Sequence, residues 1–223
     1  MNIALHGTGR TGSAARRIAL ERSHEITVEI DSKTLVTASS LSGAEVVIDF
    51  SHATALDRLV EAACEAKVDL VIGTTGWNDR LEAIRAKCLD AEIGVVWAPN
   101  FSPGATILFA VARRAAELAK EFGGFEGGIE ERHHGQKKDA PSGTAIRLAR
   151  EVERSGLDKP RIGASRVGHE PGKHTLFFDS PDDLIELTHR ARNRDGFARG
   201  AVIAAEHLHG QKGFFSFEEL IGF

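Results

Sequence analysis

Cysteine is scarce in this chain of 223 residues, which holds Cys64, Cys88 and no other. The two lie in helix-like surroundings and form no C-x-x-C pair, a pattern that argues against a zinc site and against a disulfide framework. We therefore expect reduced thiols in a cytoplasmic protein.

Long apolar runs and an excess of positive charge are missing as well. No window approaches the roughly 18 apolar residues of a membrane-spanning helix. The opening segment, MNIALHGTGR, lacks the basic region and the cleavage site of a signal peptide. We therefore expect neither a membrane-spanning helix nor a signal peptide. Lysine and arginine total 28 against 32 acidic residues, and the net charge of −4 argues against nucleic acid as a partner. With 42% hydrophobic residues, the chain can form a substantial core.

The first hundred residues alternate regularly between strand-like and helix-like segments. Apolar runs predict strands at 2–6, 25–30, 45–50, 69–73 and 94–98, and helical spacing predicts helices at 10–22, 53–67 and 78–90. Such alternation with short connections is typical of a parallel α/β sheet. Only about 14 residues separate Asp31 from Glu45, which is too few for a crossover helix and predicts a loop.

The pattern changes in the second half of the chain. A long helix is predicted from Pro103 to Gly123, followed by a strand at 125–132 and a helix at 143–155. The segments 174–179 and 183–191 are joined by a short turn and predict antiparallel strands. A helical tail at 196–208 could belong to either half. The sequence therefore predicts an α/β half followed by an α+β half.

A glycine-rich turn follows the first predicted strand. Gly7-Thr8-Gly9-Arg10-Thr11-Gly12 satisfies G-x-G-x-x-G and opens a helix, where glycines let the backbone approach a pyrophosphate and the helix N-terminus stabilises its charge. Asp31 lies 19 residues after Gly12 at the end of the second strand, where an acid can accept a ribose 2′-hydroxyl. We interpret the turn as a dinucleotide site; a turn without a ligand is the alternative. Lys33 could pair with a 2′-phosphate, so NADH and NADPH both remain open.

Two further polar loops follow predicted strands. In an open parallel sheet, ligands bind outside the carboxyl ends of the strands. We therefore expect these loops to line the same crevice and to hold the nicotinamide half of the cofactor; ordinary turns are the alternative. The loops are Gly73-Thr74-Thr75-Gly76 and Ala98-Pro99-Asn100-Phe101-Ser102.

The densest group of reactive side chains lies between Glu130 and Thr144. Adjacent histidines on an extended segment point to opposite sides, so His133 and His134 are poor joint metal ligands, and we expect no metal. Histidine is a natural proton donor near neutral pH, and lysine supplies a fixed cation or an acid. The segment Pro141-Ser142-Gly143-Thr144 begins a helix and predicts an anion site beside lysines. This favours a small molecule with carboxylates; a solvated basic loop is the alternative.

The remaining histidines carry weaker signals. His174 and His189 lie in predicted strands and could face the same cleft or be satisfied within the fold. We expect His207 and His209, at the end of the helical tail, to lie on the surface.

Together these motifs resemble the 4-hydroxy-tetrahydrodipicolinate reductase family, formerly called dihydrodipicolinate reductase, of bacterial lysine and diaminopimelate synthesis. The resemblance runs nearly end to end, and the HHxxKxDAPSGTA string is its most specific part. It covers the glycine turn, VVIDFSHATA (46–55), VIGTTGW (71–77), APNFSPGATIL (98–108), ERHHGQKKDAPSGTA (131–145), GKHT (172–175), IELTHRA (185–191) and FARGAVIAA (197–205).

The resemblance implies NADH- or NADPH-dependent reduction of 4-hydroxy-tetrahydrodipicolinate to tetrahydrodipicolinate. It makes His133 a proton donor or acceptor and Lys137 the second proton donor. It assigns substrate binding to His134, Lys137, Ser142, Gly143 and Thr144. It assigns cofactor binding to the glycine turn Gly7–Gly12 and to Gly73–Thr75 and Ala98–Phe101, to which the spacing adds Asp31.

The resemblance also implies the domain plan. A Rossmann-like parallel-sheet domain spans 1–102 and is completed by 195–223. Between them lies an α+β domain, 103–194, for substrate binding and oligomerisation, with a mixed or antiparallel sheet. The family is typically a homotetramer assembled through the sheets of this domain.

Three positions depart from the family pattern. His6 stands where many members have the first glycine of the turn, Thr11 stands at a methionine position, and Lys173 replaces a glutamate.

Two other functions remain as alternatives: a two-domain nicotinamide-dependent dehydrogenase of the amino-acid dehydrogenase type, and a dinucleotide-binding protein without catalysis.

Overall fold

A computed structural model describes residues 1–222. The chain divides into two compact units, the first formed by residues 1–103 and 194–222 and the second by Gly104–Asn193. In the described residues, no helix has both the length and the apolar character needed to cross a membrane.

The first unit contains a six-stranded sheet of order β10-β5-β4-β3-β1-β2 in which every pair of neighbours is parallel. Because parallel strands all end at the same edge, the loops that follow them gather there. This confirms the expected Rossmann-like class. The strands are β1 (Asn2–His6), β2 (Glu25–Ile30), β3 (Val46–Asp49), β4 (Asp69–Ile72), β5 (Gly94–Trp97) and β10 (Gly213–Ser216).

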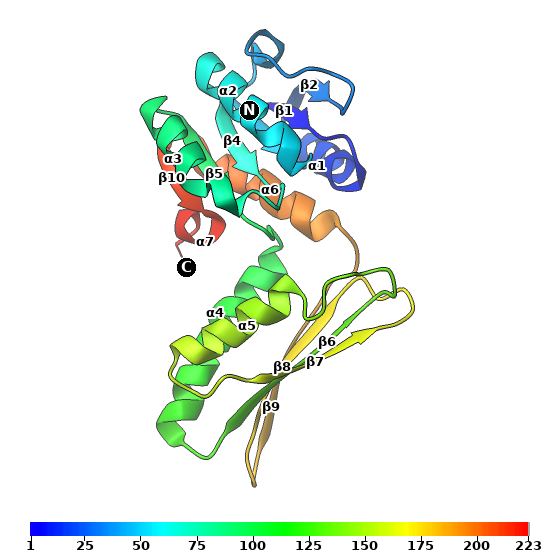
Figure 1. Ribbon diagram of the computed structural model, residues 1–223, viewed down its shortest axis with the longest axis vertical. Helices are drawn as coiled ribbons and strands as arrows, with labels where there is room; N and C mark the ends of the chain where they lie inside the picture. The colour runs from blue at the N-terminus through cyan, green and yellow to red at the C-terminus, as the bar shows by residue number, and fades with distance from the viewer. Residues whose placement is uncertain (223) are drawn as a thin grey trace. The chain divides into compact units, whose positions relative to one another are not determined.

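Helices cover both faces of this sheet (Figure 1). One buried cluster joins α1 (Arg10–Glu21), α6 (Asp195–Leu208) and α7 (Phe217–Leu220) to one face through residues such as Ile18 and Val202. A second cluster joins α2 (Ala53–Ala66) and α3 (Leu81–Asp90) to the other face through Leu59 and Ile84. Strands that are buried on both faces explain the nearly continuous apolar runs in the sequence.

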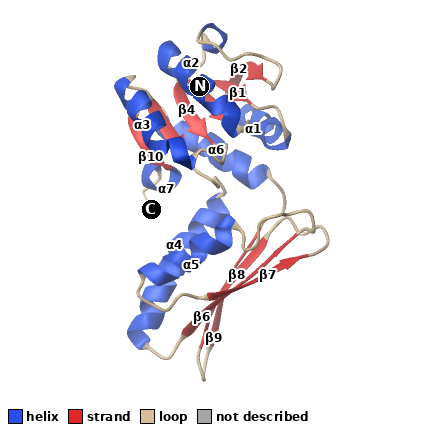
Figure 2. Ribbon diagram, viewed as in Figure 1, coloured by secondary structure: helices blue, strands red, loops and turns tan. Residues whose placement is uncertain are grey.

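The second unit is a four-stranded sheet with two helices on one face (Figure 2). Its order is β7-β6-β8-β9, in which β6 and β7 are parallel and the other pairs antiparallel. The mixed sheet confirms the expected α+β class. The core is built from side chains such as Phe109, Leu148 and Phe178. The elements are α4 (Pro103–Phe122), β6 (Glu126–His133), α5 (Gly143–Arg154), β7 (Arg161–Arg166), β8 (Lys173–Asp179) and β9 (Leu184–Arg190).

The connection between β2 and β3 contains no α-helix, as its length predicted, and only a short 3₁₀ turn, Ser39–Leu41, interrupts it. The sequence analysis missed β7, β10 and α7. The β7 segment, RIGASR, lacks an apolar alternation because most of its side chains are exposed. It becomes a strand because β6 offers it a free edge.

Candidate active site

The glycine turn between β1 and α1 is closed by contacts that tolerate no side chain. Gly7 has a φ of +93°, and a Cβ there would lie 2.5 Å from the carbonyl oxygen of Phe50. A Cβ on Gly12 would lie 1.8 Å from the carbonyl oxygen of Gly7. Both positions therefore require glycine, which alone lets the turn pack against the end of β3.

The open side of the same turn fits an anion. A Cβ on Gly9 would meet no atom within 4 Å, so the backbone is accessible there. Gly9 is the N-cap of α1, no side chain caps the helix, and its first turn contains no acidic residue. The first amide groups of α1, from Arg10 onward, are therefore neither capped nor faced by an acidic side chain of the helix itself. These residues fit the pyrophosphate of a dinucleotide.

Asp31 lies beside this turn at the end of β2. The amide of Gly7 donates to the carbonyl of Ile30 at 2.8 Å, which fixes the two strand ends together. The Oδ1 atom of Asp31 accepts hydrogen bonds from the hydroxyl and amide of Thr34 and from the amide of Lys33. These bonds, with the Thr34 hydroxyl foremost, lower the pKa of Asp31. An ionised carboxylate thus stands where a ribose hydroxyl is expected.

The loop after β4 brings further polar atoms to this edge. A Cβ on Gly73 would lie 2.3 Å from the ring of Phe50, so this loop packs directly against the end of β3. Three buried oxygen atoms here have no hydrogen-bond partner among the described residues: Asp49 Oδ2, Ser51 Oγ and Thr74 Oγ1. Buried polar atoms of this kind are usually satisfied by a ligand or by water.

The loop after β5 has both buried and accessible residues. Ala98 and Phe101 are buried, and the Phe101 ring packs against Phe217 with centroids 5.1 Å apart. Asn100 uses its Oδ1 to accept from the amide of Ser102 at 2.8 Å. The Phe101 side chain therefore belongs to the core, whereas Pro99 is exposed and Asn100 is half-buried.

His6, which departs from the family pattern, forms a buried pair with Asp49. Its Nδ1 lies 2.8 Å from Asp49 Oδ1, which also accepts from the amide of Ser51. The side chains are 6% and 0% exposed. The imidazole thus occupies space that glycine would leave empty beneath the turn, and it satisfies one oxygen of a buried carboxylate.

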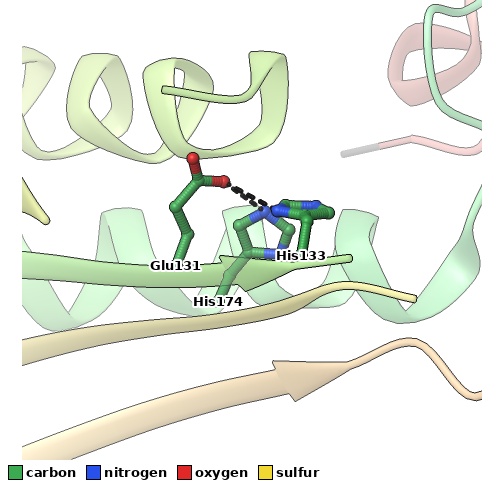
Figure 3. Close-up of side chains that lie close together, drawn as sticks. All are labelled: Glu131, His133 and His174. Atoms are coloured by element: carbon green, nitrogen blue, oxygen red, sulfur yellow. Dashed lines mark ion pairs between the residues drawn. The ribbon is translucent and has the colours of Figure 1, made fainter. Parts of the chain in front are cut away.

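In the second unit, the carboxyl end of β6 carries a polar group on its buried face. Because side chains alternate along a strand, Ile129, Glu131 and His133 share one face, and all three are buried. The antiparallel register places His174 of β8 directly opposite Glu131. Figure 3 shows the resulting arrangement of Glu131, His133 and His174, which we name the histidine cluster.

Distances within the histidine cluster are short. Glu131 Oε2 lies 3.2 Å from His133 Nδ1 and 3.4 Å from His174 Nε2. The two imidazole rings meet edge to face at 71°, with centroids 5.0 Å apart. One carboxylate oxygen therefore faces both rings.

The other carboxylate oxygen of Glu131 is firmly held. Oε1 accepts from the amide of Ser142 at 2.8 Å and from Arg166 Nη2 at 2.7 Å. Burial opposes ionisation of Glu131, but these hydrogen bonds outweigh it, so the pKa of this carboxyl lies below its ordinary value. Glu131 is therefore an anion that joins β6 to the start of α5 and to the end of β7.

Both imidazoles of the cluster favour the neutral form. Burial, followed by the nearby charge of His133, lowers the pKa of His174 to about 4 although Glu131 opposes the shift. Burial also lowers the pKa of His133; Glu131 and Asp139 oppose this, whereas Lys137 and Arg166 add to it. His174 is further held by a 3.1 Å contact between its Nε2 and Ser142 Oγ.

The loop between β6 and α5 carries the predicted lysine. Lys137 Nζ forms an ion pair with Asp139, and the carbonyl of Asp139 accepts from Arg166 at 2.6 Å. The amide of His134 donates to the carbonyl of Glu170 at 2.8 Å, which ties the beginning of the loop to the segment before β8. Lys137 and His134 thus lie on a loop that is anchored at both ends.

The first turn of α5 has the features of an anion site. Ser142 is the N-cap, and its hydroxyl accepts from the amide of Ala145 at 3.2 Å. Gly143 is exposed, a Cβ there would meet no atom within 4 Å, and the first turn has no acidic residue. Because its amide and hydroxyl are already used, Ser142 fixes the helix start, and Gly143 and Thr144 present the accessible surface.

The histidine cluster could also hold a metal ion, since its ligand atoms all lie within 4.8 Å of one another. From the sequence, we expected no metal because His133 and His134 point to opposite sides of their strand. The fold instead brings His133 close to Glu131 and His174. The guanidinium of Arg166 already neutralises Glu131 and would repel a dication on the same carboxylate. The arrangement therefore favours the exchange of protons over the coordination of a metal.

Sequence reasoning missed Glu131 and Arg166 as members of the site and left His174 undecided. Glu131 had a local signal, because it lies two residues before His133 and must share its face of the strand. Arg166 had no local signal, and His174 had only its place in the GKHT segment, since the pairing of β7 and β8 with β6 brings both residues there.

Two family models match the chain. The model of the N-terminus of dihydrodipicolinate reductase matches residues 1–101, and the model of its C-terminus matches residues 104–221. Together they span nearly the whole sequence.

Relatives and solved structures agree with these matches. A 4-hydroxy-tetrahydrodipicolinate reductase of Christiangramia forsetii is 34% identical over 233 residues, covering 99% of this chain and 98% of the relative. One of Stenotrophomonas maltophilia is 38% identical over 228 residues, covering 95% and 93%. A dipicolinate-bound dihydrodipicolinate reductase from Paenisporosarcina sp. TG-14 is similar in structure, with a TM-score of 0.81, 21% identity and 98% coverage of both chains.

Proposed function

The chain belongs to the dihydrodipicolinate reductase family, and we propose that it reduces 4-hydroxy-tetrahydrodipicolinate to tetrahydrodipicolinate with NADH or NADPH. It is accordingly an oxidoreductase of lysine and diaminopimelate biosynthesis.

The first unit is the proposed dinucleotide-binding domain. When bound, a reduced nicotinamide dinucleotide supplies the hydride. Gly7 and Gly12 allow the turn to close, and the open side at Gly9 would let the pyrophosphate approach the first turn of α1, while Asp31 would accept a ribose hydroxyl. The loops Gly73–Thr75 and Ala98–Phe101 then orient the nicotinamide half, the second of them through Pro99, Asn100 and backbone atoms.

The second unit is the proposed substrate domain. The substrate carries two carboxylates, and the first turn of α5 binds one of them through Gly143 and Thr144, in a position that Ser142 fixes. His134 and Lys137 bind the other. A dianion loses strong hydration when it enters a protein site, and these amide groups and cations offset that loss.

His133 and Lys137 are the proposed proton donors. Loss of the 4-hydroxyl requires an acid, and hydride addition leaves an electron-rich carbon–nitrogen system that must also be protonated. The pKa of His133 is low in the free protein because the site is buried and lies near cations. The negative charge of a bound dicarboxylate opposes the repulsion from these cations and stabilises the imidazolium. Substrate binding therefore favours protonation of the donor.

The observation that carries this proposal is the link through Glu131, which joins the imidazole of His133 to the anion-binding start of α5. The test is a spectrophotometric assay of nicotinamide oxidation with the diacid substrate. Turnover with this substrate is expected. Cofactor binding without turnover would favour the non-catalytic alternative, and turnover only with other substrates would favour another dehydrogenase.

Cofactor preference and assembly are part of the same proposal. Asp31 favours the 2′-hydroxyl of NADH, and Lys33 could pair with the 2′-phosphate of NADPH, so both cofactors are proposed. We infer a cytoplasmic homotetramer assembled through the sheets of the second unit. The exposure of Leu184 at 60% and of Ile185 at 43% on β9 supports an interface there. Sedimentation equilibrium tests the oligomeric state.

A further inference from the structure

Glu131 has an oxygen atom that its structural partners do not use. Oε1 is satisfied by the amide of Ser142 and the guanidinium of Arg166. Oε2 receives no regular hydrogen bond from any described residue, although the side chain is completely buried. Its neighbours are the two imidazoles, His133 Nδ1 at 3.2 Å and His174 Nε2 at 3.4 Å.

We propose that Glu131 is a positioning residue for the reaction: Oε2 accepts the Nδ1 proton of His133 and so directs Nε2 to the substrate, while Oε1 fixes the start of α5. This inference rests on the proposed function. The two ends of one carboxylate thereby hold the proton donor and the anion site at a constant spacing.

A role confined to stability does not explain this arrangement. Burying a carboxylate is costly. The hydrogen bonds from Arg166 and Ser142 offset that cost, but both are made to Oε1 and neither to Oε2. An unpaired Oε2 facing His133 Nδ1, itself buried and without a regular partner, adds further cost. Catalytic hydrogen bonds are often long or poorly aligned until ligand binds. The pair is thus placed to form its bond when the substrate arrives.

The chemistry of His133 follows from this contact. In the neutral ring, a proton on Nδ1 leaves a lone pair on Nε2, and in the imidazolium, Nε2 becomes the donor. The ionised carboxylate stabilises the imidazolium. Other charged or titratable groups also act on His133, namely Lys137 and Asp139 from the loop, Arg166 from β7 and His174 from β8. Among these neighbours, Glu131 is the anion that contacts the ring.

The tautomer of His133 in the wild-type protein is the first test. The full-length protein is labelled with ¹⁵N-histidine, and the His133 signals are assigned by their loss in His133→Gln. Above the pKa of His133, we expect the Nδ1-protonated tautomer, in the free protein or on addition of dipicolinate. An Nε2-protonated ring in both states would overturn the proposal. This measurement does not depend on turnover, so it separates failure of the proposal from failure of the assigned reaction.

The second test is Glu131→Gln, whose carbonyl can replace Oε1 toward Ser142 and Arg166 while its amide group faces His133. An amide donor favours a lone pair on Nδ1, so we expect the opposite tautomer. The value of kcat should fall about 100-fold. The limb of the pH profile that reports His133 should move to lower pH, because the stabilising anion is gone. Dipicolinate affinity should change little, because the start of α5 keeps its partner.

Glu151→Gln is the matched control. Glu151 is also a completely buried glutamate, but it pairs with Arg113, Arg147 and Arg154 on the helices. We expect this variant to lose stability and to keep the wild-type pH profile of kcat. If Glu131→Gln behaved in the same way, with wild-type kcat and an unshifted profile, Glu131 would be structural only.

Discussion

Lys137 Nζ lies 2.7 Å from Oδ1 and 2.9 Å from Oδ2 of Asp139, so the proposed second proton donor is held by a carboxylate two residues further along its own loop. The hydrogen bond from Lys137 is the main cause of the lowered pKa of Asp139. A substrate carboxylate that binds Lys137 replaces one anion with another. The loop therefore keeps the cation in place before substrate arrives, which reduces the entropy lost on binding.

Lys137→Ala should reduce kcat by about 10²- to 10⁴-fold, since it removes a general acid and a substrate contact together. Cofactor affinity should not change, because the glycine turn belongs to the other unit. Steady-state kinetics and a cofactor titration measure the two effects. Lys138→Ala is the control, because Lys138 is exposed and adjacent. Equal activity of the two variants would remove Lys137 from the site.

Two glycines of the turn should separate stability from cofactor binding. Gly12→Ala places a methyl group 1.8 Å from a carbonyl oxygen, so it should lower both the melting temperature and the cofactor affinity. Gly9→Ala meets no protein atom and should leave the melting temperature nearly unchanged, yet block the approach of the pyrophosphate. Calorimetry and cofactor titration test this pair. Undiminished cofactor binding by Gly9→Ala would refute the anion site at this turn.

Asp31→Ser should shift cofactor preference toward NADPH. The ionised carboxylate repels a 2′-phosphate, and its removal should raise the ratio of kcat/KM for NADPH to that for NADH by about tenfold or more. Thr34→Ala is the control, because it removes one hydrogen bond to Asp31 but leaves the charge. We expect that control to keep the wild-type ratio. An unchanged ratio in Asp31→Ser would place the ribose elsewhere.

His174 should make the protein less stable in mild acid. Its pKa is about 4 in the folded protein against an ordinary 6.5, so between these values the unfolded chain binds a proton that the folded protein does not. Stability therefore falls as pH decreases through this range, by about 3 kcal/mol from this residue. Urea unfolding at pH 7, 6 and 5 measures the slope.

The matching variant is His174→Gln, which removes the titrating group. Its free energy of unfolding at pH 7 should be lower, because the contacts to Ser142 and Glu131 change. Between pH 6.5 and 4, the free energy of unfolding of this variant should depend less on pH than that of the wild type. Between pH 7 and 8, the pH dependence of the two proteins should be the same. Equal slopes in the acid range would show that His174 titrates normally.

Local sequence was sufficient for five of the six strands of the first unit, β1 to β5, and for the helices between them. Apolar runs of the right length, the glycines of the turn and the acid at Asp31 are short-range signals, because each depends on backbone conformation or on burial of a neighbouring stretch. The missed strand β10 has no such signal. Its four residues, Gly213–Ser216, form a strand by pairing with β5, more than a hundred residues earlier.

In the second unit, the sequence by itself determined the helix start at Ser142 and the presence of His133 and Lys137 beside it, because capping and spacing are local. Only the tertiary structure decided what these residues face. The register between β6 and β8 brings His174 opposite Glu131, and the pairing of β6 with β7 brings Arg166 beside His133. Strand pairing is a long-range choice that minimises exposed apolar surface and unpaired backbone groups over the whole sheet. Neighbouring residues alone do not determine which strands pair. The charge and pKa of the proton donor His133 depend on that pairing.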